Sequence, residues 1–246
     1  MEIGVSIERA KELITACKLN LSLETIHLDK ANGRILAKGL MSKVNDPRFD
    51  NSAMDGWAVK KEDCSSSNQT ILRIVGEIRA GSESIHTINS GEACKITTGA
   101  PMPKGADAIV IVENSRIDGE NVIITGQAEE SFIRIKGENL SKGKLAIPEG
   151  TCMEPSTISL AATMGYDEIS VFRKPIIGII STGDELVMPN SEIKEWQIFE
   201  SNSFGIAALI EKMGGEPIRY GIVTDSIGQL RETMNDAVEN CDALIT

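Results

Sequence analysis

The segment that decides the fold is residues 175–186, PIIGIISTGDEL, in which a continuous apolar run ends in a polar turn. An unbroken apolar run is typical of a strand that is buried on both faces of a parallel sheet. The pattern after it predicts a helix at 204–213, a strand at 217–223, a helix at 227–239 and a strand at 243–246. This βαβαβ alternation predicts a parallel sheet with right-handed crossovers.

Carboxylates follow the first two of these strands. Asp184 and Glu185 come directly after the first strand, and Asp225 follows the second. Ligands of parallel sheets bind at the carboxyl ends of the strands, so two acidic strand ends favour a site there. Each residue also has a plain structural explanation, because Asp225 or Ser226 can cap the next helix and Asp184 can stabilise a turn.

Upstream of the parallel sheet, residues 57–147 consist of short β-branched runs separated by glycines and polar turns, which predicts a small β domain. The expected strands are 71–75, 93–97, 108–112, 122–125 and 132–135, and residues 64–69 (CSSSNQ) are expected to form a surface turn.

The rest of the chain predicts two helices and one irregular passage. Ser6 can cap an amphipathic helix that ends near Asn20, and residues 31–40 are expected to pass from a short helix to a strand. Pro155 suits the first position of a helix that runs to Met164, with a glycine next to end it.

Composition excludes some functions. A net charge of −11 over 246 residues argues against nucleic-acid binding, which needs a basic surface. The sequence has no apolar run of membrane-spanning length and no signal-peptide pattern, so we expect a cytoplasmic protein without a membrane partner. Five widely spaced cysteines are expected to be reduced, namely Cys17, Cys64, Cys94, Cys152 and Cys241.

Two polar loops are candidates for chemistry. The first, residues 46–58 (DPRFDNSAMDGWA), carries Asp46, Asp50 and Asp55, whose oxygens suit a hard divalent cation or a polar ligand group. The second, residues 97–103 (TTGAPMP), leaves two hydroxyls in an irregular loop. Either loop can instead be an ordinary connector between strands. An anionic substrate would need a bound cation or local bases such as Lys60, Lys61, Arg134 and Lys136.

Four stretches, in this order, resemble the MoeA/gephyrin E-domain family, the molybdopterin molybdenumtransferases: FDNSAMDGWA (49–58), TTGAPMP (97–103), STGDEL (181–186) and SNS (201–203). The resemblance implies a homodimeric, elongated multidomain protein that inserts molybdate into adenylylated molybdopterin and releases AMP. It also implies Mg2+ or another divalent cation, and molybdopterin adenylyltransferase as the pathway partner.

The resemblance further implies a multidomain α/β and β fold. A helical and extended linker and dimerisation domain would comprise residues 1–45 and 138–172. A β-rich domain would be inserted at 46–137, and a partial three-layer α/β, MogA-like molybdopterin-binding domain with a parallel sheet would follow at 173–246.

Carried over position by position, the resemblance implies a set of site residues. The catalytic residues would be Asp55, Thr98, Glu185 and Asp225, with Asp55 facing Glu185 and Asp225 across a dimer interface. The substrate-binding residues would be Ser52, Asp50, Asp184, Asn202, Ser203 and Arg134, and the metal ligands would be Asp55, Glu185, Asp225 and Asn139.

The sequence departs from the family pattern in three places. Asn139 stands where the family commonly has aspartate, which weakens a metal role, and Trp57 stands where tyrosine is usual. The family continues beyond the position of Thr246 with a Gly/Ser-rich loop, an aspartate, lysines and a C-terminal β domain. The resemblance therefore implies that these residues form an N-terminal portion that inserts little or no molybdenum alone.

Two other readings stay open at this point. One is a scaffold or interaction protein of the gephyrin type, for which the four catalytic residues would not be needed together. The other is a nucleotide-binding module without catalysis, for which the turn at residues 181–186 would suffice.

Overall fold

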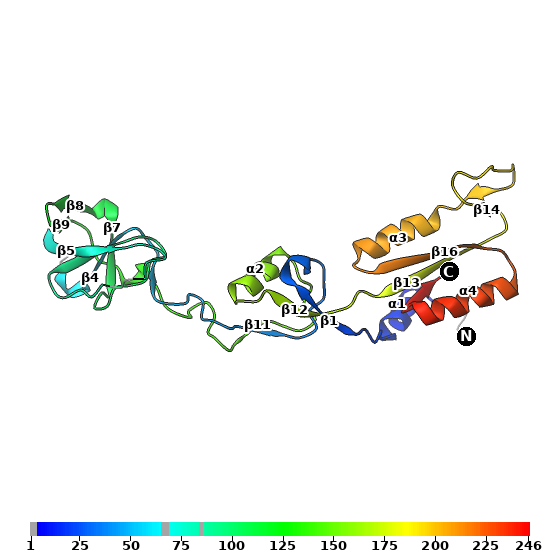
Figure 1. Cartoon of the computed structure of the whole chain (residues 1–246), viewed down its shortest axis with the longest axis horizontal. Coiled ribbons are helices and arrows are strands. Elements are labelled where there is room, and N and C mark those ends of the chain that lie inside the picture. The colour runs from blue at the N-terminus through cyan, green and yellow to red at the C-terminus, as the bar shows by residue number, and fades with distance from the viewer. Residues whose placement is uncertain (1–3, 65–68, 84–85) are drawn as a thin grey trace. The chain divides into compact units, whose positions relative to one another are not determined.

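The structure of the chain, a computed structural model, describes residues 4–64, 69–83 and 86–246 and is shown in Figure 1. It divides into two compact units. The first unit comprises Met1–Lys38, Glu149–Ile158 and Asp167–Thr246, and the second comprises Gly39–Pro148 and Ser159–Tyr166. The segments expected to form a separate linker domain are shared between these units, so the three-domain division remains a prediction.

The first unit contains most of the helices. Its elements are α1 (Ile7–Ala16), β1 (Leu23–His27), the 3-10 helix η1 (Leu28–Lys30), β12 (Glu168–Phe172), β13 (Ile176–Thr182), β14 (Leu186–Val187), β15 (Ile198–Phe199), α3 (Asn202–Lys212), β16 (Glu216–Val223), α4 (Ile227–Asn240) and β17 (Ala243–Ile245).

The predicted parallel sheet is confirmed. Its strand order is β16-β13-β17, and β13 pairs in parallel with both neighbours. The first crossover runs from β13 to β16, and the second runs back from β16 past β13 to β17. Because the two crossovers run in opposite directions, right-handed connections place α3 and α4 on opposite faces, as Figure 1 shows. Ile179 and Ile180 of β13 are buried under these layers. The unbroken apolar run thus corresponds to a strand that is covered on both faces of the sheet.

An ion pair joins the beginning of β13 to the beginning of β17. Arg173 donates through two nitrogens to the carboxylate of Asp242, at 2.5 and 2.6 Å, and the backbone N–H of Ile176 donates to the same carboxylate at 2.7 Å. The hydrogen bond from Arg173 is the main cause that lowers the pKa of Asp242 below its ordinary value. This contact fixes both strands at the amino-terminal edge of the sheet.

The N-terminal helix is capped as predicted but is shorter than predicted. The N–H of Arg9 donates to the Ser6 hydroxyl at 3.1 Å, yet α1 ends at Ala16 instead of near Asn20. Cys17 already has an extended backbone, and no residue of α1 is buried. Short helices without tertiary packing are marginal, so the apolar stripe alone does not prolong α1.

The short helix predicted in the passage at 31–40 is absent, whereas the strand predicted after it begins at Leu40. Gly33 turns the chain with a φ of +75°. The backbone N–H groups of Leu36 and Ala37 donate to Thr151 and Ser170, so the segment is held by bonds to distant residues. Helix α2 (Pro155–Thr163) forms as expected and runs from the first unit into the second, and Gly165 follows it with a φ of +88°.

The second unit is mainly β structure. Its remaining elements are β2 (Leu40–Met41), β3 (Asn51–Ser52), β4 (Gly56–Val59), η2 (Lys61–Asp63), β5 (Thr70–Ile78), β6 (Glu92–Ile96), β7 (Ala108–Ile111), η3 (Val112–Asn114), β8 (Ser115–Asp118), β9 (Asn121–Ile124), η4 (Glu130–Phe132), β10 (Ile133–Arg134) and β11 (Leu145–Ile147). The turn predicted at 64–69 lies largely outside the described residues.

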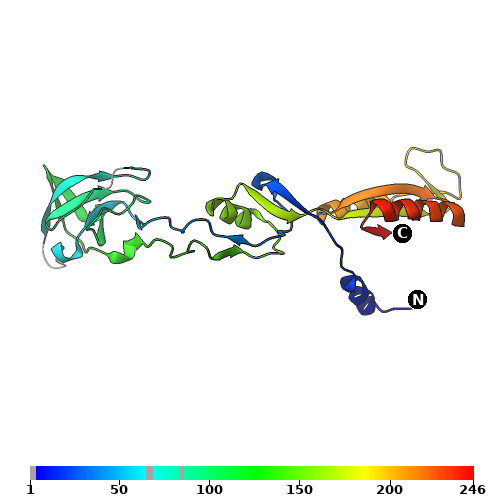
Figure 2. The same cartoon turned by 60° about the horizontal axis from the view of Figure 1, so that its bottom comes forward.

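Six of these strands form one curled sheet, visible in Figures 1 and 2, with the order β7-β4-β6-β5-β9-β8. Every residue of β4 is buried: Trp57 and Val59 join one apolar cluster and Ala58 joins another. Gly56 must lack a side chain, because a Cβ there would lie 2.0 Å from the carbonyl oxygen of Val110 on β7. The end of the segment at 46–58, from Gly56 on, is therefore an interior strand of this sheet, between β7 and β6.

No helix in the described part of the chain combines the length and apolar character that membrane crossing requires.

Candidate active site

The structure brings together Asp55 and Thr98, two predicted catalytic residues that are distant in sequence. The Asp55 carboxylate accepts hydrogen bonds from the backbone N–H of Thr98 at 2.6 Å and from its hydroxyl at 3.0 Å. Both residues are exposed. The backbone bond, followed by the hydroxyl bond, lowers the pKa of Asp55 below its ordinary value. The pair is thus an ionised carboxylate of fixed orientation that faces solvent.

The two loops that carry this pair are joined by backbone bonds. The N–H of Ser52 donates to Ala100 at 3.0 Å, and the N–H of Gly99 donates to Ser52 at 2.8 Å. Ser52 is completely buried, and its hydroxyl bonds within its own turn, to Met54. Ser52 therefore stabilises the loop that carries Asp55, and because it is completely buried its side chain cannot contact a substrate.

The other two carboxylates of the first loop accept hydrogen bonds from different parts of the chain. Asp50 accepts from the backbone N–H of Lys136 at 2.7 Å, and Asp46 accepts from the side-chain amide of Asn139 at 3.1 Å. Arg134 lies on β10, exposed, opposite Asn51. Asp46, Asp50 and Asp55 are thus not gathered around one point.

Of the predicted local bases, Lys60 and Lys61 are already paired with carboxylates. The Nζ of Lys60 lies 3.6 Å from Glu62, and that of Lys61 lies 2.9 Å from Glu130. These two lysines are therefore partly neutralised within the protein.

The strand-end carboxylates lie in the first unit, at neighbouring parallel strands. The backbone N–H of Asp225 donates to the Asp184 carboxylate at 3.3 Å, which joins the loop after β16 to the loop after β13. Glu185 folds back over Gly183, where a Cβ would lie 2.5 Å from a Glu185 carboxylate oxygen. Gly183 has a φ of +144°, so a glycine suits this turn for two reasons.

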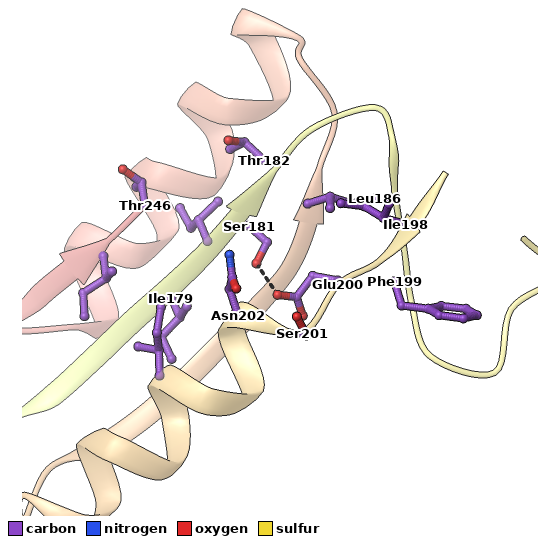
Figure 3. Close-up of a pocket in the computed structure, with 13 residues that line it drawn as sticks. Ile179, Ser181, Thr182, Leu186, Ile198, Phe199, Glu200, Ser201, Asn202 and Thr246 are labelled. Atoms are coloured by element: carbon purple, nitrogen blue, oxygen red, sulfur yellow. Dashed lines mark hydrogen bonds between the residues drawn. The ribbon is translucent and has the colours of Figure 1, made fainter. Parts of the chain in front are cut away.

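A pocket of about 290 Å3 opens beside these strand ends and is shown in Figure 3. Ser181 and Thr182 line it from β13, Asn202 lines it from the beginning of α3, and Thr246 lines it from the end of β17. Ile198 and Phe199 supply an apolar wall from β15. Of the predicted substrate-binding residues, Asn202 lies in this pocket. Ser203 is buried behind it, and Asp184, Glu185 and Asp225 lie outside the lining.

Glu200 is a pocket residue that the sequence interpretation missed. Its carboxylate is 3% exposed and accepts from the backbone N–H and the hydroxyl of Ser203, both at 2.7 Å, and from the Ser181 hydroxyl at 3.1 Å. It thereby caps α3 and ties the helix to β13, as the dashed line in Figure 3 indicates for Ser181. An acidic residue just before a helix is a recognisable sign of such a role.

Opposing effects set the charge of Glu200. Burial raises its pKa, but the hydrogen bonds from Ser203 and Ser181 and the nearby charge of Arg219 outweigh burial and leave the pKa below its ordinary value. Glu200 is therefore an ionised carboxylate that its hydrogen bonds stabilise inside the protein.

The described residues contain no group of three or more His, Cys, Asp or Glu side chains that could bind a metal ion unaided. Asp184, Glu185 and Asp225 are all exposed at the strand ends and carry hard oxygen donors. Such donors fit Mg2+, which keeps several waters and is commonly held by one or two carboxylates together with substrate phosphates.

Comparisons with known protein families match both units. The family described as "MoeA N-terminal region (domain I and II)" matches residues 5–165, and "Probable molybdopterin binding domain" matches residues 178–246.

Individual relatives agree with these families. A molybdopterin molybdenumtransferase from Nostoc sp. is 39% identical over 227 residues, which are 91% of this chain and 52% of the relative. The Haemophilus influenzae protein of the same name is 32% identical over 225 residues, which are 91% of this chain and 55% of that protein. The crystal structure of a molybdopterin biosynthesis MoeA protein from Pyrococcus horikoshii superposes with a TM-score of 0.89 at 32% identity, covering 96% of this chain and 64% of the other. The chain thus spans about half the length of the curated relatives it matches.

Proposed function

The chain belongs to the MoeA family, as its four motifs predicted, and from this premise we propose that it contributes to a molybdopterin molybdenumtransferase. In this proposal the protein takes adenylylated molybdopterin and molybdate as substrates, inserts molybdenum and releases AMP. A transferase of this kind acts in molybdenum cofactor biosynthesis.

The pairing of Asp55 with Thr98 is the observation that supports this function most directly. Nothing in the packing of β4 requires an ionised carboxylate beside it, yet two donors of Thr98 hold Asp55 at the surface. A solvent-facing carboxylate whose orientation is fixed is suited to act on a substrate. A scaffold would not require this exposed, ionised carboxylate together with Thr98, Glu185 and Asp225.

Each cluster has its own part in the proposed reaction. The pocket around Ser181 and Asn202 holds the pterin end of the substrate against the apolar wall of Ile198 and Phe199. In the proposed homodimer, Asp55 of the other protomer, oriented by Thr98, acts at the phosphoanhydride from which AMP departs.

A divalent cation fits this chemistry. We propose Glu185 and Asp225 of one protomer and Asp55 of the other protomer of the homodimer as its ligands, and Asn139 as a weaker candidate because its amide carries no charge. When bound, the cation would neutralise negative charge that develops on the substrate's phosphates.

The proposal includes the larger organisation. We propose a linker and dimerisation domain at 1–45 and 138–172, a β-rich domain at 46–137 and a molybdopterin-binding domain at 173–246. We further propose a cytoplasmic homodimer that receives its substrate from a molybdopterin adenylyltransferase.

Release of AMP under single-turnover conditions tests this function, with protein in excess over adenylylated molybdopterin and with molybdate and Mg2+ present. We expect slow release that requires molybdate, because the chain spans about half the length of its relatives. Asp55→Ala should abolish release, whereas Asp118→Ala, which removes an exposed carboxylate at the β8–β9 hairpin, should not. Measurable release that is equal in the two variants would contradict the proposal.

A further inference from the structure

A small pocket in the second unit is lined mainly by basic side chains. Four cations, Lys43, Arg48, Lys136 and Lys142, line it together with Asn45 and Val44, and its volume is about 190 Å3. We call these six residues the basic pocket. No carboxylate lines it, although the chain as a whole has a net charge of −11.

Within the described part of the chain, the cations of the basic pocket form no ion pair. The acids that are close in sequence, Asp46, Asp50 and Glu138, keep their charges but accept hydrogen bonds from a backbone N–H or from an amide. Like charges that converge without ion-pair partners repel, and an anion between them relieves that repulsion.

The backbone that carries these side chains is well ordered by hydrogen bonds. Asp46 and Leu140 exchange two backbone bonds, at 2.8 and 3.1 Å, and the N–H of Gly137 donates to Pro47 at 2.9 Å. The side-chain oxygen of Asn45 accepts from the backbone N–H of Lys142 at 2.8 Å. The two segments that present the cations are thus fastened to each other, so the spacing of their Cα atoms is fixed before any ligand arrives.

Lys43 is held at the rim by neutral groups only. Its Nζ lies 3.8 Å from the centroid of the Tyr166 ring and 3.2 Å from the carbonyl oxygen of Gly165. These contacts orient the ammonium group but leave its charge uncompensated. The oxygen of the Asn45 amide is occupied by Lys142, so its NH2 group is the neutral donor available in the pocket.

We propose that the basic pocket binds a tetrahedral dianionic oxyanion, either free or as the terminal phosphate of a phosphate ester. Ammonium groups, an arginine fork and an amide NH2 are the donors that recognise such a group. A pocket of this size is smaller than the ~300–1,000 Å3 typical of drug-sized ligands, which favours a small anion. The negative field of the whole chain opposes the approach of long polyanions, so an acidic peptide or a nucleic acid fits less well.

The basic pocket is distinct from the Asp55–Thr98 pair and from the pocket around Ser181. Molybdate and AMP are also the substrate and product of the proposed function, so binding at the basic pocket is recognised by the affinity that its variants lose. Release of AMP reports the proposed function, and a protein could pass either test and fail the other.

The test is calorimetric titration of the 246-residue chain at low salt with three probes: molybdate, inorganic phosphate and AMP. We expect saturable binding that becomes weaker as the salt concentration rises. Arg48→Glu/Lys136→Glu should weaken it at least about tenfold, because repulsion replaces two attractions. The control Lys18→Glu/Arg116→Glu changes net charge equally at exposed residues outside the pocket and should stay within about twofold of the native chain.

A second variant, Lys136→Gln/Lys142→Gln, covers the case in which charge reversal disturbs folding, and circular dichroism checks every variant. Binding of molybdate and phosphate in mutual competition would identify a free oxyanion, and binding of AMP alone would identify a phosphate ester. The proposal is overturned if no probe binds the native chain, if the control pair loses as much affinity as the pocket variants, or if an oligoglutamate peptide binds where no oxyanion does.

Discussion

Glu200→Ala removes the carboxylate that joins α3 to β13. Three hydrogen bonds disappear at once, two from Ser203 and one from Ser181, all to a side chain that is 3% exposed. The substitution also leaves the Ser203 N–H at the beginning of α3 without its acceptor. We therefore expect α3 to be bound less tightly to the parallel sheet.

The size of the effect follows from these contacts. A hydrogen bond to a charged partner stabilises a protein by ~1.5–3 kcal/mol, and a buried donor left unsatisfied costs ~1–3 kcal/mol. The three bonds share one carboxylate and are not additive, and burial of the charge has a cost of its own. We therefore expect Glu200→Ala to destabilise the α3 region by about 3 kcal/mol.

Hydrogen–deuterium exchange of peptides from α3, read by mass spectrometry at pH 7, measures this loss locally. A loss of about 3 kcal/mol corresponds to exchange that is about a hundredfold faster, provided that α3 exchanges through opening of its own region. Glu200→Gln keeps one acceptor oxygen but loses the charge, so it should fall between Glu200→Ala and the native chain. Glu211→Gln changes an exposed residue of the same helix and is the matched control.

The reasoning is refuted if Glu200→Ala exchanges no faster in α3 than Glu211→Gln does. The pH dependence gives a second check. The pKa of Glu200 is lowered in the folded chain, so its contribution is fully present above the ordinary glutamate pKa of 4.5 and is lost as the pH falls through the lowered value. The difference between Glu200→Ala and the native chain should therefore shrink in acid.

Three further predictions concern single contacts. Asp242→Asn should cost about 1–2 kcal/mol at pH 7 because it breaks the charged contact with Arg173. Since the pKa of Asp242 is lowered from 3.8, this cost should diminish as the pH falls below that value, which urea unfolding at several pH values would show. Gly56→Ala would place a Cβ 2.0 Å from a carbonyl oxygen of β7 and should lower stability by at least about 3 kcal/mol, measured by thermal unfolding. Thr98→Val keeps the N–H but removes the hydroxyl, so the pKa of Asp55 should rise part of the way toward its ordinary value in a carboxyl NMR titration, and an unchanged pKa would contradict the assigned contact.

Local sequence patterns predicted the helices and strands well where the order of apolar and polar residues shows which face of the element is buried. The apolar run of β13 and the capped helices after it specify a parallel sheet, because each pattern reports which faces are covered. The prediction failed where distant residues decide the conformation. The passage at 31–40 takes its shape from bonds to Thr151 and Ser170, and α1 ends early because none of its residues is buried.

The same division applies to the site. Asp55 and Thr98 were predicted individually, but only the fold shows that the N–H of Thr98 is a donor to Asp55. Ser52 was predicted as a substrate contact, and its complete burial could not be read from a turn pattern. Glu200 was missed because its importance depends on where β13 and β15 place their ends, which the linear sequence does not display.

The most direct test of the central claim is calorimetric titration of the chain with adenylylated molybdopterin, with and without Mg2+, beside AMP alone. We expect saturable binding of adenylylated molybdopterin that Mg2+ tightens, and at least about tenfold weaker binding by Asn202→Asp, which adds a negative charge to the pocket. Glu211→Gln should bind as the native chain does. Absence of binding, or equal affinity for AMP alone, would contradict the claim that this chain forms part of a molybdopterin molybdenumtransferase.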